Sequence, residues 1–358
     1  MIYDTGEYDI QLEIPSDNFV VKSLCPLDLE SMNDYLDSIR VNDSNTLIIL
    51  LGIWNCLPED FQWVESLNQY CTKHKNPVIV FTGKLTGNDE FFYPQTIKFS
   101  LCRLGIFDLV SNLYWDNNYK NHFRSWQKDC DIKRKHKFYW ASSKDLYTRR
   151  FILAGLLKEN LLENNLINYK CVHTAVPGTW IKDSIDPVLW EQINEECNSI
   201  SHLLPLPAID DTLNFWQTDI KFYLYSYVGI ITDTIFENGV FLSEKVFNAI
   251  NYQQIFFYVG YHGTLQYLRD QGYYTFDDVF DTSYDSITDH AIRLIAARNS
   301  LLDFLKQPVD QIQLAYEKSI PAIKHNKQLL QQQRPDLQFT QYIQDYLNEH
   351  RTTATDIS

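Results

Sequence analysis

The first regular feature of the chain is an unbroken apolar run of strand length, NTLIILLGIW at 45–54. A second run of this kind, NPVIVFTG, follows at 76–83. Between them Pro58 suits a first helical turn, and four residues recur on one helical face: Phe61, Val64, Leu67 and Cys71. A strand, a helix and a strand in this order predict a parallel sheet, because parallel neighbours need a crossover between them.

The pattern restarts after a charged segment at 127–137, QKDCDIKRKHK. A short strand and a helix open the second part, and strands and helices alternate again after a Pro-containing, weakly periodic stretch at 176–211, which we interpret as irregular or partly helical. The predicted strands are 137–142, 222–234 and 254–260; the predicted helices are 145–164, 243–250, 263–272 and a long polar pattern from 289 onward.

This alternation predicts an α/β protein with two Rossmann-like domains facing a cleft. A chain of 358 residues also exceeds what one hydrophobic core usually organises. We place an N-terminal α/β domain at 1–132, a second domain at 133–310, and C-terminal helices with a tail at 311–358.

The charge balance of the chain argues against nucleic acid and anionic membranes as its partners. The chain has 31 Lys and Arg against 46 Asp and Glu, a formal net charge of -15, which repels nucleic acid and anionic membranes at long range. The seven cysteines form no C-x-x-C pair, so we expect reduced thiols. The N-terminus has no signal-peptide pattern, and no run of about 18 apolar residues occurs. We therefore expect a cytoplasmic protein without membrane insertion.

Candidate chemistry begins with the Ser-Glu-Lys triplet that opens the predicted helix at 243–250. Ser243 can cap the helix, Lys245 can add positive charge to a diphosphate held by the helix N-terminus, and Glu244 can accept hydrogen bonds from a ribose diol. The alternative is structural: a capping serine, an acid that suits the first turn, and a solvent-exposed lysine.

The stretch from VGIITDT through FLSEKVFNAI to IFFYVGYHGTLQYLRDQGYYTFDDVFDTSYD resembles the donor-sugar domain of family 10 α-1,3-fucosyltransferases and related viral and bacterial glycosyltransferases. The resemblance spans roughly 136–305 and implies a GT-B fold. It implies that Glu244 binds the ribose, that Lys245 binds phosphate, and that Asp233 stands where the family has a glutamate.

The segment KFYWASSKDLYTRRFILAGLL is similar to the family's other donor-site segment, a strand, a Ser or Asn, a short loop, and an arginine opening a helix. Ser142 matches the polar residue, and Ser142 or Ser143 can also cap the helix. Arg150 or its neighbour Arg149 would then hold the diphosphate leaving group.

A transferase of this kind also needs a base that deprotonates the acceptor hydroxyl. Asp89 and Glu90, on a loop after the second apolar run, are our candidates, and His122, His136 and His262 are alternatives. His262 lies in GYHGT, where Gly260 and Gly263 leave room for a ligand, so it is also a candidate donor-binding residue.

The segment FDDVFD at 276–281 contains three carboxylates (Asp277, Asp278 and Asp281). One hypothesis is that they bind a metal ion; we prefer the interpretation that the segment is an acidic surface loop.

The leading hypothesis is an inverting, metal-independent glycosyltransferase that uses a GDP- or UDP-type sugar and needs no further cofactor. The predicted acceptor is a glycan or a lipopolysaccharide-type saccharide. Three alternatives stay open: a virus-encoded enzyme that modifies DNA bases, a nucleotide-sugar-binding protein without turnover, and an unrelated α/β protein in which the triplet only caps a helix.

Overall fold

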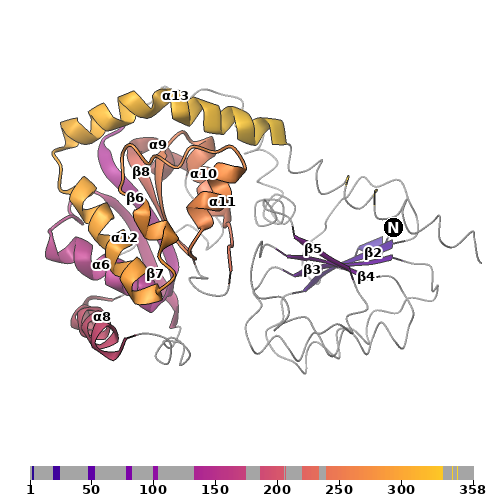
Figure 1. Cartoon of the computed structure of the whole chain (residues 1–358), viewed down its shortest axis with the longest axis horizontal. Coiled ribbons are helices and arrows are strands. Elements are labelled where there is room, and N and C mark those ends of the chain that lie inside the picture. The colour runs from indigo at the N-terminus through magenta and orange to yellow at the C-terminus, as the bar shows by residue number, and fades with distance from the viewer. Residues whose placement is uncertain are drawn as a thin grey trace, which may run out of the picture. The chain divides into compact units, whose positions relative to one another are not determined.

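The computed structural model describes five N-terminal strands, residues 133–174, 186–204, 206, 220–233 and 239–333, and residues 341 and 345 (Figure 1). For the N-terminal strands and for 143, 144, 170–174, 220, 221, 244 and 333, only the backbone is described. The chain divides into two compact units. One contains 1–127 with 241–244 and 333–358, and the other contains 128–240 with 245–332.

The N-terminal unit contains a five-stranded sheet in which every pairing is parallel and the spatial order follows the sequence. The two strands predicted at 45–54 and 76–83 are confirmed and pair directly, with Ile49 opposite Ile79. The predicted helix between them lies outside the described residues. The strands are β1 (Ile2–Tyr3), β2 (Phe19–Leu24), β3 (Leu47–Gly52), β4 (Val78–Thr82) and β5 (Ser100–Arg103).

The C-terminal unit is built on a four-stranded parallel sheet with the order β7-β6-β8-β9. Its strands are β6 (His136–Asp145), β7 (Leu166–Thr174), β8 (Ser226–Thr232) and β9 (Ile255–Val259). Every residue of β8 and β9 is buried, which is why both strands read as continuous apolar runs rather than as alternating patterns. The predicted α/β class with parallel sheets is thereby confirmed.

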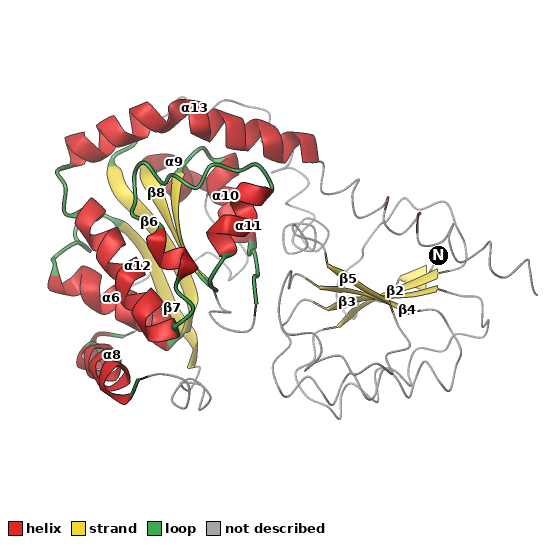
Figure 2. Cartoon of the chain, viewed as in Figure 1, coloured by secondary structure: helices red, strands yellow, loops and turns green. Residues whose placement is uncertain are grey.

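Helices cover both faces of this sheet (Figure 2). α6, α8 and α12 lie on one face, and α10 and α11 on the other. The helices are α6 (Tyr147–Lys158), α8 (Pro187–Ser199), α9 (Ile220–Tyr225), α10 (Glu244–Asn251), α11 (Thr264–Asp270), α12 (His290–Leu305) and α13 (Val309–Gln333), with 3-10 turns at η2 (Ser201–Leu203) and η3 (Ser283–Ser286).

Close packing holds α10 and α13 in place. A Cβ on Gly229 of β8 would lie 2.7 Å from Gln254 Oε1 and 3.3 Å from Ala249 Cβ, so glycine lets α10 approach the strand. On α13 the Tyr316 hydroxyl donates to Gln253 O at 2.9 Å, and its ring meets Tyr227 at 5.5 Å. These contacts place α13 near the ends where β8 and β9 begin.

Two local predictions were wrong. Residues 222–225 belong to α9 rather than to a strand, because the chain turns into β8 only at Ser226. Ser142 and Ser143 cannot cap α6, since β6 continues through Asp145 and Leu146 occupies the N-cap position. The stretch 176–211, interpreted as irregular or partly helical, contains the helix α8, which is capped by Asp186, whose carboxylate accepts from the amides of Val188 and Leu189.

Candidate functional site

The strand order of the C-terminal unit creates a switch point between β6 and β8. From β6 the chain crosses through α6 to β7 on one side, and from β8 it crosses through α10 to β9 on the other. Both helices therefore begin at the carboxyl ends of the strands, where helix amides offer partial positive charge. Ligands of open α/β sheets bind at this kind of position.

Arg149 bridges the switch point. Its side chain belongs to the first turn of α6, is only 2% exposed, and donates from Nη2 to the carbonyl of Thr232 at the end of β8, at 3.0 Å. Trp140 of β6 donates from Nε1 to Thr232 Oγ1, also at 3.0 Å. No side chain caps α6 at Leu146, and its first turn contains no acid. Arg149 and the amides of this first turn therefore supply positive charge between β6 and β8, next to Asp233, which directly follows Thr232.

Arg150 has a different environment from Arg149. It donates to both oxygens of Asp145, from Nε at 2.6 Å and from Nη2, and a further bond runs from Nη1 to Ser201 Oγ at 3.0 Å. The hydrogen bond with Asp145 raises the pKa of Arg150. Asp145 also accepts from the Tyr169 hydroxyl at 2.9 Å. Arg150 thus joins α6 to β6 and η2, and Arg149 is the arginine bonded to the end of β8.

Asp233 follows β8 directly and is 3% exposed. Its amide donates to Val259 O at 2.9 Å, and its Oδ2 accepts from the Tyr258 hydroxyl. A Cβ on Gly260 would lie 2.7 Å from the Tyr258 ring and 3.4 Å from Asp233 Oδ2, so glycine allows this close approach. The ends of β8 and β9 are therefore joined around one buried carboxylate.

The Ser-Glu-Lys triplet lies at the start of α10, as predicted. Ser243 directly precedes the helix and is buried, yet its hydroxyl has no hydrogen-bond partner among the described residues, so the predicted capping bond is not formed. Lys245 is half-buried, and the side chain of Glu244 lies outside the described residues. A buried hydroxyl without a partner at a helix N-terminus is a group that a bound ligand could satisfy.

Two further residues near the carboxyl end of β9 were missed by the sequence analysis, Arg293 and His290 of α12. Arg293 is buried and donates to Gly260 O at 3.2 Å and to Ile287 O at 2.8 Å. Its Nη2 lies 2.8 Å from His290 Nδ1. No periodic signal distinguishes these residues from other members of a helix, and only the fold brings them beside the GYHGT loop.

Burial and the charge of Arg293 disfavour protonation of the two histidines near it, His290 and His262. Burial lowers the pKa of His290 to about 4, and the charge of Arg293 acts in the same direction. Burial and Arg293 also lower the pKa of His262, whose ring packs on Tyr261 with centroids 4.1 Å apart. Because arginine can only donate, His290 Nδ1 must accept, which leaves the proton of the neutral ring on Nε2.

The remaining sequence candidates separate into three groups. Asp89, Glu90 and His122 lie outside the described residues. His136 begins β6, at the opposite end of the sheet, with Nδ1 2.6 Å from Asn164 O. In FDDVFD, Asp277 accepts from Arg269, Thr275 and Thr282, and these bonds outweigh burial and lower its pKa. Within the described ranges, no three His, Cys, Asp or Glu side chains are grouped to hold a metal.

No family model matches the chain, and no curated protein shows significant sequence similarity to it. Among solved structures, it is similar to a trehalose-6-phosphate synthase, OtsA, with a TM-score of 0.44 and 12% identity over 93% of this chain and 72% of the other. An α,α-trehalose-6-phosphate synthase from Burkholderia multivorans has a TM-score of 0.39 and 11% identity over 92% and 75%.

An α,α-trehalose-phosphate synthase (UDP-forming) from Burkholderia vietnamiensis has a TM-score of 0.38 and 10% identity over 90% of this chain and 78% of its own. None of the helices in the described ranges has the length and apolar character needed to cross a membrane.

Proposed function

We propose that the protein is a glycosyltransferase that binds a nucleoside-diphosphate sugar at the carboxyl ends of the C-terminal sheet and transfers the sugar to a hydroxyl of a saccharide acceptor. The observation that carries the proposal is the position of Arg149. It connects the uncapped first turn of α6 to the end of β8, beside Asp233, at the switch point of a parallel sheet.

The chemistry of sugar transfer fits this arrangement. Breaking the bond between sugar and diphosphate places negative charge on the leaving group, and fixed cations and helix N-termini stabilise that charge. In the proposed site Arg149 and Lys245 supply two cations, while α6 and α10 supply helix N-termini. We propose that the Ser243 hydroxyl donates to the diphosphate and that Glu244 binds the ribose, as in the family 10 fucosyltransferases that the sequence resembles.

The acceptor side of the proposal depends on the N-terminal unit. Asp89 and Glu90 remain our candidates for the base, and inversion by direct displacement is the expected stereochemical course. The protein would need no metal, because the cations and helix amides above match the charge of a diphosphate. A GDP- or UDP-type donor and a saccharide acceptor complete the proposed reaction.

A thermal-shift screen against GDP-, UDP-, CMP- and dTDP-sugars with EDTA present tests the donor site. A ligand that binds only the folded state raises its apparent stability, so we expect one donor to raise the melting temperature by several degrees. Arg149→Gln and Lys245→Ala should abolish the shift. Arg150→Gln is the matched control: it should lower the melting temperature of the free protein but keep the shift.

A shift that survives in Arg149→Gln, or the absence of a shift with every donor and with added Mg²⁺ or Mn²⁺, would contradict the proposal. Transfer itself is measured as release of the nucleoside diphosphate in the presence of saccharide acceptors. Donor binding without release would favour a second candidate, a nucleotide-sugar-binding protein. The observation behind that candidate is that Asp233, shorter than the family's glutamate, is bonded to the Tyr258 hydroxyl.

A further inference from the structure

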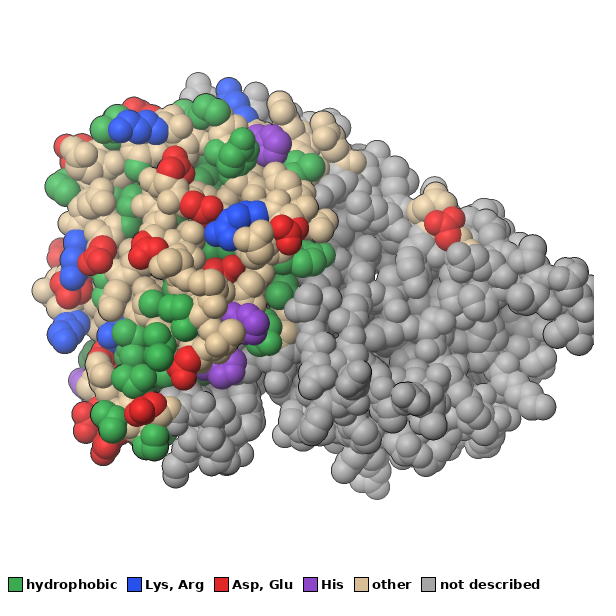
Figure 3. All heavy atoms as spheres, in the orientation of Figure 1, with side chains coloured by type: hydrophobic (Ala, Val, Ile, Leu, Met, Phe, Trp, Pro, Cys, Tyr) green, Lys and Arg blue, Asp and Glu red, His purple; other side chains and the backbone are tan. Residues whose placement is uncertain are grey.

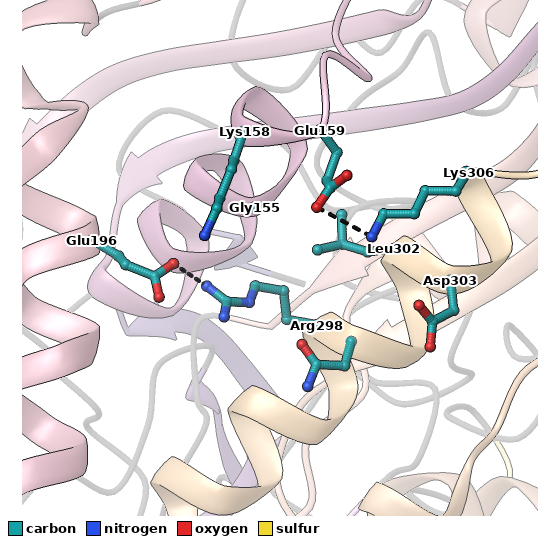
Figure 4. A pocket seen from close by; sticks show the side chains of 9 residues that line it. Gly155, Lys158, Glu159, Glu196, Arg298, Leu302, Asp303 and Lys306 are labelled. Carbon is teal, nitrogen blue, oxygen red and sulfur yellow. Dashed lines mark hydrogen bonds and ion pairs between the residues drawn. The ribbon is translucent and has the colours of Figure 1, made fainter.

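A cavity of about 310 Å³ lies at the opposite end of the C-terminal unit (Figure 4). The residues that line it come from the last turn of α6, from α8 and from the second half of α12. Because α6 starts at the carboxyl ends of the strands, its last turn lies near their amino ends. The end of α12 also lies near the amino ends of the strands, because Lys137 Nζ, at the start of β6, donates to Leu305 O at 2.8 Å.

Arg298 forms the fixed base of the cavity. The whole residue is only 8% exposed, and its Cζ lies 3.6 Å from the centroid of the Phe151 ring. Nη1 donates to Glu196 Oε2 of α8. Gly155 makes room for the stem, because a Cβ there would lie 2.8 Å from Arg298 Cδ. The guanidinium is therefore held in one orientation by a ring, a carboxylate and a helix surface.

Lys158 extends from α6 toward the guanidinium of Arg298 (Figure 4). Within the described part of the chain no carboxylate pairs with Lys158, and Arg298 Nη2 has no hydrogen-bond partner. This end of the cavity thus combines two cations, Lys158 and Arg298, with one anion, Glu196, a local balance of +1. The other end holds Asp303 and the pair between Lys306 Nζ and Glu159 Oε1, 3.1 Å apart.

We propose that a small oxyanion, a phosphate monoester or a carboxylate, binds between Lys158 Nζ and Arg298 Nη2. A guanidinium with free N–H groups matches the geometry of carboxylate and phosphate oxygens, and an ammonium beside it adds charge without competing for the same atoms. The chain as a whole is acidic, so two converging cations with one carboxylate are not a by-product of a basic surface.

Protection of Lys158 from acylation tests the proposal on the full chain. The protein is treated with an amine-reactive ester in sodium phosphate, in sodium acetate and in sodium chloride at equal ionic strength, and each lysine is followed by peptide mass spectrometry. We expect phosphate or acetate to slow acylation of Lys158 several-fold relative to chloride. Lys318, exposed on α13, is the internal control and should react equally in all three. The more effective anion identifies the preferred head group.

Two variants make the test decisive. Glu196→Gln removes the competing charge but keeps an acceptor for Arg298, so protection should occur at a several-fold lower anion concentration. Arg298→Met keeps an apolar stem over Phe151 and against Gly155, and protection should be lost. Equal protection of Lys158 and Lys318, or full protection in Arg298→Met, would overturn the proposal. No nucleotide sugar is present, so the outcome is independent of the proposed transferase activity.

Discussion

Buried arginines hold together the loops of the C-terminal unit. Arg134 donates to Tyr223 O at 2.7 Å and to Gln253 O at 2.8 Å, and it also reaches the carbonyls of Leu224, Ser226 and Tyr252. Arg293 has the same role near β9. Backbone carbonyls satisfy these charges without a carboxylate, which suits positions where chain segments end together.

At the residue scale, His290 should make stability depend on pH. Its pKa of about 4 in the folded protein lies below the value of about 6.5 for an unfolded histidine. The unfolded chain therefore binds the proton first as pH falls, and stability present above pH ~6.5 is lost toward pH 4. Since the ring is partly exposed, we expect a loss of about 1 kcal/mol from this group rather than the full value of the shift.

Urea denaturation of the wild type and His290→Gln between pH 7.5 and 4.5 measures this effect. The free energy of unfolding of His290→Gln should fall less steeply with acidification. Asp285, whose pKa burial raises, is common to both proteins and cancels in the difference. His325→Gln, on α13, is the control for removing a histidine. Parallel pH profiles for wild type and His290→Gln would refute the prediction.

At the element scale, the packing of α6 on α12 depends on a glycine in the middle of a helix. Gly155 lowers the helix propensity of α6 by about 1 kcal/mol relative to alanine, so its presence needs a reason in packing. The reason is lack of space: a Cβ on residue 155 would lie against the Arg298 stem and only 3.0 Å from Leu302 Cδ1. Neither neighbour is visible from the pattern of α6 alone.

Gly155→Ala should therefore destabilise the protein by roughly 1 kcal/mol, because overpacking outweighs the gain in propensity. A double-mutant cycle with Arg298→Ala separates the two effects. Without the arginine stem, the same glycine substitution should cost much less or become stabilising. The measurement is the free energy of unfolding of all four proteins, and an equal cost in both backgrounds would show that Arg298 is not the obstacle.

At the scale of the whole molecule, acidity is the property with the widest effect. Figure 3 shows acidic and basic side chains interspersed over one face of the C-terminal unit rather than gathered into a basic field. With a net charge of -15 and an isoelectric point near 5.0, long-range attraction to a phosphate backbone is absent. The saccharide is accordingly preferred over DNA as the proposed acceptor.

We expect no retardation of duplex DNA by the protein in a gel-shift assay, even at low salt, where electrostatic attraction is strongest. The measurement should be repeated with a saturating nucleotide sugar, since a DNA-modifying enzyme would bind its acceptor in that state. Salt-sensitive binding of DNA at micromolar protein would contradict the prediction and move the DNA-base alternative to the front.

The sequence by itself determined the α/β class, the parallel sheets and the position of the triplet at a helix start. These follow from apolar runs that fill both faces of a sheet and from helical spacing, which are local properties of the chain. Errors arose where local preference was overruled: Phe222 to Tyr225 are good strand formers but form α9, and β6 extends past Ser142 because its pairing with β7 continues to Asp145.

Only the tertiary structure decided which side chains meet. The sequence did not distinguish Arg149 from Arg150 as the residue that holds the diphosphate. Consecutive residues of a helix point in different directions, so in the fold Arg149 reaches Thr232 at the end of β8 and Arg150 reaches Asp145 at the end of β6. His290 and Arg293 reach the end of β9 because α12 packs beside it, and the cavity at Arg298 exists because three helices end or cross there. Such contacts join residues distant in sequence, so local pattern cannot specify them.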